Sequence, residues 1–402
     1  MADHKPLRVL ILGIVDGEIT FLDRLITGLS DQNIQIILSH TKRQQKRPNG
    51  NHSIQYFWTP PIKQGIIRQV FTLIYLLISS LRSKHNHWLK AQVKKEENFK
   101  DKIGVFIRYA PFCHGAFDVI YFPWNSTAIT YKGLFEMALP VVISCRGSQI
   151  NIRPHLPGQQ AFVTGLHETF QKATAVHCIS KDIQHAAEAF GLDPKKVVII
   201  HPAVNTDFFS PVNIKNNNKH LKIIMIGSLR WSKGYEYGLI AFSKFLKYYK
   251  RAELHIIGDG IEKQNLLFTI NDIGIENNVI IHGKLTPSKV RDKLRESDIF
   301  LHSSLSEGFT NAVLEAQACG LPVICFNTGG LPENIIDNVS GFLIPLRDTS
   351  KMARALNKLA IDPVLRKKMG IDARKRVLNK FDITQQIDDF ITLFTHLASK
   401  KN

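Results

Sequence analysis

The chain has 402 residues, of which 44% are hydrophobic and 21% charged, as in ordinary soluble globular proteins with room for two domains. The first residues lack the basic, apolar and small-residue order of a signal peptide, so we expect a cytoplasmic protein. The formal net charge of +18 predicts an anionic partner. Between Lys42 and Arg108 lie 14 Lys and Arg and only 3 Asp and Glu, so this segment alone carries a net charge of +11.

The five cysteines are scattered through apolar runs and have no metal-ligand spacing. An odd, scattered set of this kind predicts reduced core thiols in a reducing compartment. They are Cys113, Cys145, Cys178, Cys319 and Cys325.

The N-terminal segment predicts a buried strand at 8–12, a glycine-bearing turn with Gly13 and Gly17, and a helix over 21–29. Such a turn can bring backbone amides close to a phosphate or a sugar, or the glycines can serve the turn alone. A second strand is predicted at 34–39 and is followed by a basic, turn-rich loop.

The stretch 60–90 is the most distinctive of the chain. Residues 66–81 are mostly apolar, but they fall short of the ~20 residues that a membrane-spanning helix needs. One interpretation is a buried helix. The favoured one is an amphipathic helix in the interface of an anionic membrane, with contact through residues 60–108 and with Trp88 among the anchors.

Further strands are predicted within 117–124 and 140–148. Arg146 ends the second of them and could hold a phosphate or an anionic acceptor, or it could be an ordinary surface arginine. An asparagine-rich linker around 213–220 indicates a domain boundary near 205–220, and the predicted domains are 1–204 and 205–380.

The second domain opens with a strand that ends at Gly227. Arg230 and Lys233 follow just before a helix, where cations oppose the helix dipole. A bound anion would reverse the sign of that cost, so the two residues predict a pyrophosphate site; the alternative is a pair of solvated bases.

The segment 298–345 predicts strand, loop, helix, strand, Gly-Gly turn, helix and strand. Glu307 lies in the loop before a helix at 311–318, and Glu315 lies two turns into it, so both can face one cleft at the carboxyl end of a strand. The amides of Phe309, Thr310 and Asn311 would form an anion site at the start of this helix.

The string E-G-F-x-N-x-x-x-E, followed by A-x-x-C-G-L-P-V and G-G-x-P-E, resembles family 4 of the retaining glycosyltransferases. The resemblance implies the α/β GT-B fold, in which two doubly wound Rossmann-like domains face an interdomain cleft. G-x-x-R-x-x-K-G, from Gly227 on, is similar to the diphosphate-binding motif of that family. The family usually has His-Gly where this chain has Arg146 and Gly147; His155 is a candidate substitute. In relatives, residues matching 282–287 border the base, and the last helix (here about 380–402) packs back on the first domain.

The resemblance implies a hexosyltransferase that uses a UDP- or GDP-sugar as donor and retains the anomeric configuration. Glu307, Arg230 and Lys233 are the predicted catalytic residues. The predicted substrate-binding residues are Gly17, Arg146, Gly227, Gly308, Phe309, Thr310, Asn311 and Glu315.

No Asp-x-Asp sequence stands in a strand-end loop, so neither a metal nor another cofactor is expected. The predicted acceptor is a glycan or lipid-linked molecule of cell-surface polysaccharide or lipopolysaccharide synthesis, handled at the cytoplasmic face of the membrane. A soluble acceptor stays open, and no nucleic-acid-binding module is present. Two other classes stay open as well: a nucleotide-sugar 2-epimerase of the same fold, and a non-catalytic sugar-nucleotide-binding subunit.

Overall fold

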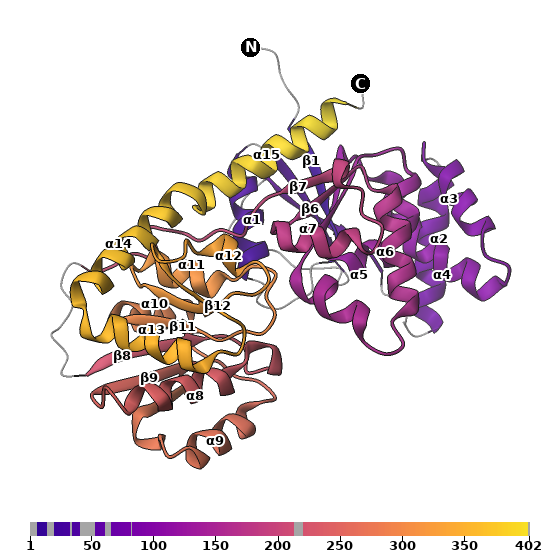
Figure 1. Cartoon of the computed structure of the whole chain (residues 1–402). Coiled ribbons are helices and arrows are strands. Elements are labelled where there is room, and N and C mark those ends of the chain that lie inside the picture. The colour runs from indigo at the N-terminus through magenta and orange to yellow at the C-terminus, as the bar shows by residue number, and fades with distance from the viewer. Residues whose placement is uncertain are drawn as a thin grey trace, which may run out of the picture. The chain divides into compact units, whose positions relative to one another are not determined.

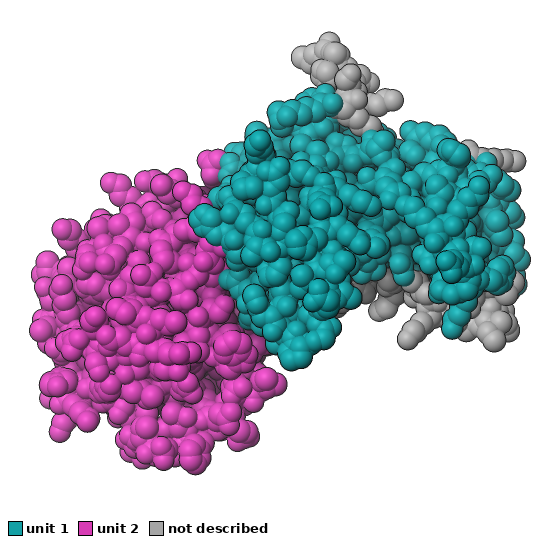
Figure 2. Space-filling view, turned by 45° about the vertical axis from the view of Figure 1, so that its right-hand side comes forward, with its two compact units in different colours: residues 1–178, 184–200, 387–402 teal, residues 179–183, 201–386 magenta. Residues whose placement is uncertain are grey.

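The structure is a computed structural model of the whole chain (Figure 1). It describes residues 6–13, 20–32, 34–40, 53–60, 66–81, 83–212 and 220–400. The chain forms two compact units (Figure 2), each a parallel β-sheet with helices around it, which confirms the predicted α/β fold class. Unit 1 comprises residues 1–178, 184–200 and 387–402, and unit 2 comprises 179–183 and 201–386.

The sheet of unit 1 has seven parallel strands in the order β3-β2-β1-β4-β5-β6-β7. Their bounds are β1 Leu7–Ile11, β2 Ile34–His40, β3 Ile54–Trp58, β4 Val119–Phe122, β5 Val141–Cys145, β6 Ala175–Cys178 and β7 Val197–Ile199. The edge strand β3 was not predicted. It pairs on one side only and exposes Gln55 and Tyr56, so it lacks the continuous apolar run of a central strand.

Three helices inserted between β3 and β4 gather at one end of unit 1 (Figure 1). They are α2 Ile66–Leu81, α3 Asn86–Lys94 and α4 Phe99–Tyr109, followed by the 3-10 turn η1 Ala110–His114. The other helical elements of this part of the chain are α1 Thr20–Ser30, α5 Asn125–Thr130, η2 Lys132–Glu136, η3 Ser148–Ile152, η4 Arg153–His155, α6 Gln160–Lys172, α7 Lys181–Glu188 and η5 Pro194–Lys196.

The last helix, α15 Ile383–Ser399, completes the core of unit 1. The rings of Phe390 and Phe394 lie 5.7 and 5.6 Å from the ring of Tyr121 on β4. Phe390 also meets the buried ring of His177 on β6, at 4.9 Å between centroids. These aromatic contacts attach the C-terminal segment to the first sheet, because each buried ring removes a large apolar area from water.

The sheet of unit 2 has six parallel strands in the order β10-β9-β8-β11-β12-β13. Their bounds are β8 Leu221–Ile226, β9 Ala252–Ile257, β10 Val279–Gly283, β11 Ile299–His302, β12 Val323–Phe326 and β13 Gly341–Ile344. The chain order runs outward in opposite directions from β8 and β11. The topological switch point of the sheet therefore lies between these two strands.

The helices of unit 2 include α11, which spans the predicted residues Asn311–Ala318. The others are η6 Trp231–Lys233, α8 Tyr235–Leu246, α9 Lys263–Asp272, η7 Glu276–Asn278, α10 Pro287–Glu296, α12 Leu331–Asn334, α13 Thr349–Ile361 and α14 Pro363–Lys380. All five cysteines of the chain are buried free thiols, as predicted.

Candidate functional site

Two loops meet at the switch point of unit 2, one after β8 and one after β11. Backbone hydrogen bonds hold the first loop in place: the N–H of Leu229 donates to the carbonyl of Asp259 over 3.0 Å, and the N–H of Leu305 donates to the carbonyl of Ser232 over 2.8 Å. The loops are therefore fixed against each other at the edge where open α/β sheets bind ligands.

Gly234 makes this approach sterically feasible. It has a positive φ of 55° between η6 and α8, and a Cβ at this position would lie 2.3 Å from the carbonyl oxygen of Ser303. The hydroxyl of Ser303 donates to the carbonyl of Gly234 over 2.8 Å. Only glycine fits such a conformation and contact without strain, and the result is that Lys233 reaches the second loop.

Lys233 and Glu307 form an ion pair across the switch point, between Nζ and Oε1. The same carboxylate oxygen lies 3.0 Å from Nε2 of His302 and accepts a hydrogen bond of 2.8 Å from the hydroxyl of Ser304. Glu307 is buried, and burial by itself would raise its pKa. The charge of Lys233 and the hydrogen bond from His302 outweigh burial and lower the pKa of Glu307 to about 2. Glu307 is thus a carboxylate at any physiological pH.

Tyr235 supports the base of this site. Its hydroxyl donates to the carbonyl of Gly227 over 2.8 Å. Burial and, to a smaller degree, the negative charge of Glu307 raise the pKa of Tyr235. The phenol is neutral, so it holds the end of β8 as a hydrogen-bond donor rather than as a charge.

The predicted anion site at the start of α11 lies beside Glu307. Gly308, Phe309 and Thr310 are buried, and the N–H of Thr310 donates to Oδ1 of Asn334 over a long 3.4 Å. Asn311 opens the helix and is half-buried, as is Glu315 two turns further on.

The Gly-Gly turn after β12 fixes the backbone of Glu307. Gly329 has a φ of 53°, and a Cβ there would lie 1.9 Å from the carbonyl oxygen of Glu307. The N–H of Gly330 donates to that same carbonyl over 3.0 Å. The first glycine of the G-G-x-P-E motif is therefore required for steric reasons, because no side chain fits between Gly329 and the backbone of Glu307.

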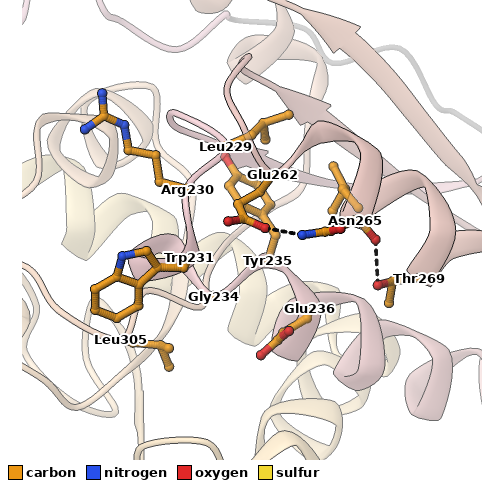
Figure 3. A pocket seen from close by; sticks show the side chains of 11 residues that line it. Leu229, Arg230, Trp231, Gly234, Tyr235, Glu236, Glu262, Asn265, Thr269 and Leu305 are labelled. Carbon is orange, nitrogen blue, oxygen red and sulfur yellow. Dashed lines mark hydrogen bonds between the residues drawn. The ribbon is translucent and has the colours of Figure 1, made fainter.

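Arg230 is exposed and does not join Lys233 at Glu307. Figure 3 shows its side chain directed away from Glu262 and Asn265, which lie in a pocket beside the loop. The pocket is lined by Leu229, Arg230, Trp231, Gly234, Tyr235, Glu236, Glu262, Asn265, Leu266, Thr269 and Leu305. Since Lys233 and Glu307 are not among the lining residues, this pocket is a neighbour of the switch-point site rather than part of it.

The candidate residues of the first domain lie in unit 1. Gly17 is outside the described residues. Arg146 follows β5, with its guanidinium carbon 5.7 Å from the ring centre of Trp124. Burial lowers the pKa of Arg146 while Tyr121 acts in the opposite direction, so this side chain is no ordinary solvated arginine. His155 packs against Phe190, with 5.8 Å between ring centroids.

Sequence reasoning missed the part played by Glu333, the last residue of G-G-x-P-E. Its carboxylate accepts hydrogen bonds from the N–H groups of Lys181 and Asp182, over 3.1 and 3.2 Å, and lies 3.0 Å from Nε2 of His201. Burial raises the pKa of Glu333, but His201 and the two N–H groups have the larger combined effect and lower it. Glu333 therefore binds the first two residues of α7, which belong to unit 2. Only long-range contacts reveal this role of Glu333 at a helix start.

The contact of His302 with Glu307 was not predicted either. The position of His302 at the end of the apolar run D-I-F-L-H, where a strand reaches the ligand-binding edge of the sheet, could have indicated a site residue. Across residues 6–13, 20–32, 34–40, 53–60, 66–81, 83–212 and 220–400, no three His, Cys, Asp or Glu side chains are grouped as metal ligands.

Solved structures share this arrangement over nearly the whole chain. Anabaena HepE, solved in complex with UDP and glucose, has a TM-score of 0.70 at 17% identity, over 96% of this chain and 99% of that one. Sucrose-phosphate synthase from Thermosynechococcus elongatus has a TM-score of 0.75 at 15% identity, over 98% and 100%. The fold is the GT-B fold of glycosyltransferases.

Residues 208–376, less than half of the chain, match the model of the family "Glycosyl transferases group 1". The D-inositol 3-phosphate glycosyltransferase of Streptomyces bingchenggensis is 28% identical over 201 residues, 46% of this chain. The N-acetyl-alpha-D-glucosaminyl L-malate synthase of Bacillus anthracis is 32% identical over 172 residues, 43% of this chain. Each match spans 44% of the relative's own length, less than half of it.

Proposed function

We propose that the protein is a retaining glycosyltransferase that moves a hexose from a UDP- or GDP-sugar to a glycan or lipid-linked acceptor. The observation that carries this proposal is the Lys233–Glu307 pair, held across the switch point beside the N-terminus of α11. A cation and a row of helix-start amides favour a diphosphate, and the neighbouring carboxylate favours sugar hydroxyls. The Streptomyces bingchenggensis relative is a glycosyltransferase by name, which supports the same class.

The donor is proposed to lie with its diphosphate between Lys233 and the amides of Phe309, Thr310 and Asn311. Gly227 and Gly308 let the donor approach the backbone closely, and Arg230 turns inward to add a second cation. Glu315 accepts hydrogen bonds from the ribose. Glu307 accepts them from the transferred sugar, since a carboxylate with a pKa of about 2 has no proton to give as a general acid.

In the proposed step the bond from the sugar C1 to the diphosphate oxygen breaks, and an acceptor hydroxyl forms its bond to C1 on the same face. The hydroxyl proton passes to the departing diphosphate, so atoms and charges balance without a protein base. Lys233 and the helix amides stabilise the charge that grows on the diphosphate. We propose that they also make a metal ion unnecessary.

The acceptor is proposed to be an anionic or lipid-linked glycan of cell-surface polysaccharide synthesis, used at the cytoplasmic face of a membrane. Arg146 supports an anionic acceptor group, because a half-buried guanidinium at the carboxyl end of β5 can bind a phosphate or carboxylate at low cost.

The test is a screen of UDP- and GDP-sugars for release of nucleoside diphosphate, with and without EDTA. We expect release from one donor, unchanged by EDTA and abolished in Glu315→Ala. The matched control is Glu236→Ala, which removes an exposed carboxylate of α8 in the same unit. Absence of both release and binding for every nucleotide-sugar would overturn the transferase proposal. Loss of release with EDTA would overturn metal independence alone.

A further inference from the structure

Helix α2 presents an apolar face to the outside of unit 1. Every exposed side chain of residues 71–81 is aliphatic or aromatic: Phe71, Ile74, Tyr75, Leu77, Ile78 and Leu81. At about 100° per residue these positions fall within one half of the helix circumference. Phe71 is 70% exposed and Ile78 is 65% exposed, so most of the surface of these side chains is accessible to solvent.

The opposite face of α2 is buried and partly polar. It carries Thr72, Leu76 and Ser80, all less than a tenth exposed. The hydroxyl of Ser80 donates to the carbonyl of Leu77 over 3.1 Å, so this helix satisfies its own inward polar group. The usual pattern of a surface helix is inverted here, because two hydroxyl-bearing residues face the protein and six large apolar ones face outward.

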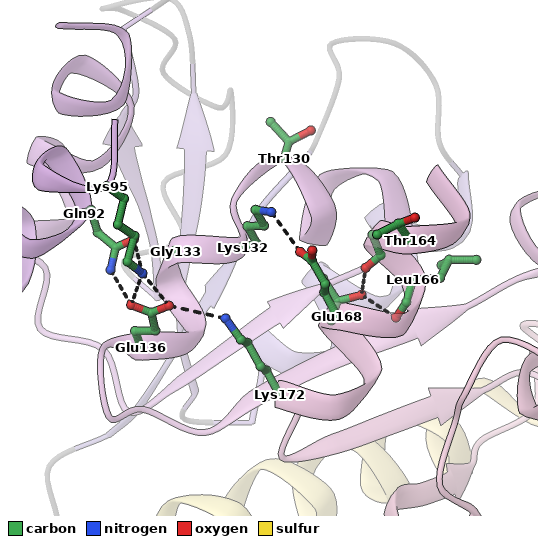
Figure 4. A network of polar contacts seen from close by, with 12 residues as sticks. Gln92, Lys95, Thr130, Lys132, Gly133, Glu136, Thr164, Leu166, Glu168 and Lys172 are labelled. Carbon is green, nitrogen blue, oxygen red and sulfur yellow. Dashed lines mark hydrogen bonds and ion pairs between the residues drawn. The ribbon is translucent and has the colours of Figure 1, made fainter. Parts of the chain in front are cut away.

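The inserted helices are fixed to unit 1, so the apolar face is displayed in a defined position. The hydroxyl of Ser83, just after α2, donates to the carbonyl of Cys113 in η1. Just after α3, Nζ of Lys95 lies 2.6 Å from the carboxylate of Glu136, which also accepts a hydrogen bond of 2.6 Å from Gln92 of α3 and pairs with Lys172 (Figure 4). These polar contacts connect α3 to η2 and α6, and the Ser83 hydrogen bond connects the end of α2 to η1.

Trp88, the predicted membrane anchor, is half-buried and lies outside the set of exposed α2 residues. Its indole N–H donates to the carbonyl of Gly133 over 3.1 Å, and its ring meets Tyr109 at 5.7 Å. Two other aromatic residues lie at the exposed face of α2. Tyr75 belongs to this face, and the ring centroid of Trp58 of β3 lies 6.2 Å from that of Tyr75. Tyr and Trp are the residues that favour the water–membrane boundary.

We propose that this α2 face inserts into the interface of an anionic lipid bilayer. The charge of the surrounding sequence favours this occupant: Lys42 to Arg108 has a net charge of +11, and Lys84 and Lys90, which follow α2 in the chain, are exposed. A symmetric dimer through α2 would bring two such basic segments together, which like-charge repulsion opposes. A bilayer with anionic lipids offers apolar depth and negative charge together.

The helix lies in the plane of the membrane in this proposal. Its 16 residues span about 24 Å, less than the ~30 Å hydrocarbon core, and its Leu76 face is held by protein. In the ranges that the structure describes, no helix is both long enough and apolar enough to cross a membrane.

The experiment measures sedimentation of the full chain with vesicles of phosphatidylcholine, alone or mixed with phosphatidylglycerol. We expect binding to the mixed vesicles, weakened by salt, and a loss of about tenfold or more in affinity for the double variant Phe71→Gln, Ile78→Gln. The control is Phe268→Gln, Ile371→Gln, which removes two side chains of unit 2 that are 71% and 57% exposed and should bind like the wild type.

Unchanged binding of the α2 variant, or equal losses in both variants, would overturn the proposal. So would a wild-type dimer that ignores vesicles and becomes monomeric in the α2 variant, since the face would then join two copies of the chain. All four substituted residues are exposed, and thermal unfolding checks that the variants fold. No donor or acceptor is present in the assay, so this proposal and the proposed function fail separately.

Discussion

Two carboxylates of this protein, Glu307 in unit 2 and Glu136 in unit 1, have the same depressed pKa in different parts of the fold. For each, burial raises the pKa, and partner cations and hydrogen bonds lower it to about 2. Glu307 is 9% exposed and pairs with Lys233 at the switch point of its sheet. Glu136 is 35% exposed and pairs with Lys95 and Lys172 on the surface (Figure 4).

The comparison teaches that a shifted pKa alone does not identify a functional site. The cluster around Glu136 joins α3 to η2 and α6, and its cations belong to different elements that need fixing together. The cluster around Glu307 joins two loops at the edge where ligands bind, next to a helix start. Position in the fold, and not the strength of the ion pair, separates the two.

The largest expected difference follows from removing one lysine of each cluster. Lys233→Met leaves a buried carboxylate without its cation and should lower the free energy of unfolding by about 3–5 kcal/mol. Lys95→Met leaves a partly solvated carboxylate that retains Lys172, so the loss should be about 1 kcal/mol or less. Urea unfolding of both variants checks this. Equal losses would show that the Glu307 pair is as solvated as the surface pair.

The second difference concerns activity and uses isosteric variants of the two carboxylates. Glu307→Gln should lower kcat by about tenfold or more, because a hydrogen bond from a sugar hydroxyl to a charged acceptor becomes one to a neutral acceptor. KM for the donor should not rise, since the freed charge of Lys233 still attracts the diphosphate. Glu136→Gln should leave both constants unchanged. Steady-state kinetics with the donor found in the nucleotide-sugar screen tests this, and a rise in KM with constant kcat would contradict it.

Much of unit 2 was predictable because its signals are local. The helix Asn311–Ala318 has periodic apolar residues, a glycine stop and a following proline, and each of these acts within a few residues. That Lys233 and Glu307 bind the same donor stays a prediction. Their direct pairing was not predictable, because it depends on β8 and β11 being neighbours although 74 residues separate the two side chains.

The misses have the same physical origin. Local periodicity shows that α2 is apolar, but it does not show which face of α2 the protein covers. That depends on how α2 packs against η1 and α4, with Leu76 and Ser80 buried. Gln92, Lys95, Glu136 and Lys172 form one cluster only after folding, and no spacing in the sequence connects them. The edge strand β3 is short and half exposed, so its pattern resembles that of a loop.

The third prediction concerns acid. The folded-state pKa of both carboxylates, about 2, lies below the ordinary value of 4.5, so the folded protein binds these protons less readily than the unfolded chain. Their contribution to stability is thus complete above pH 4.5 and is lost as the pH falls towards 2. In urea unfolding, the difference in the free energy of unfolding between the wild type and either Gln variant should decrease as the pH falls from 4.5 towards 2. A gap that widens on acidification would contradict the ionised state of that residue.

The smallest expected effect is the salt dependence of the free energy of unfolding. It distinguishes the Glu136 cluster from the Glu307 cluster most directly. Mobile ions screen partly solvated charges such as Glu136 far more than buried ones such as Glu307. The wild-type advantage over Glu136→Gln, about 1 kcal/mol at most in low salt, should shrink towards zero in high salt. The advantage over Glu307→Gln should persist, because no ion can enter between Lys233 and a carboxylate enclosed by His302 and Ser304. Urea unfolding at two salt concentrations measures both gaps. Parallel loss of both would place Glu307 in contact with bulk solvent, and the site would then lack the low-dielectric setting on which its proposed catalytic use depends.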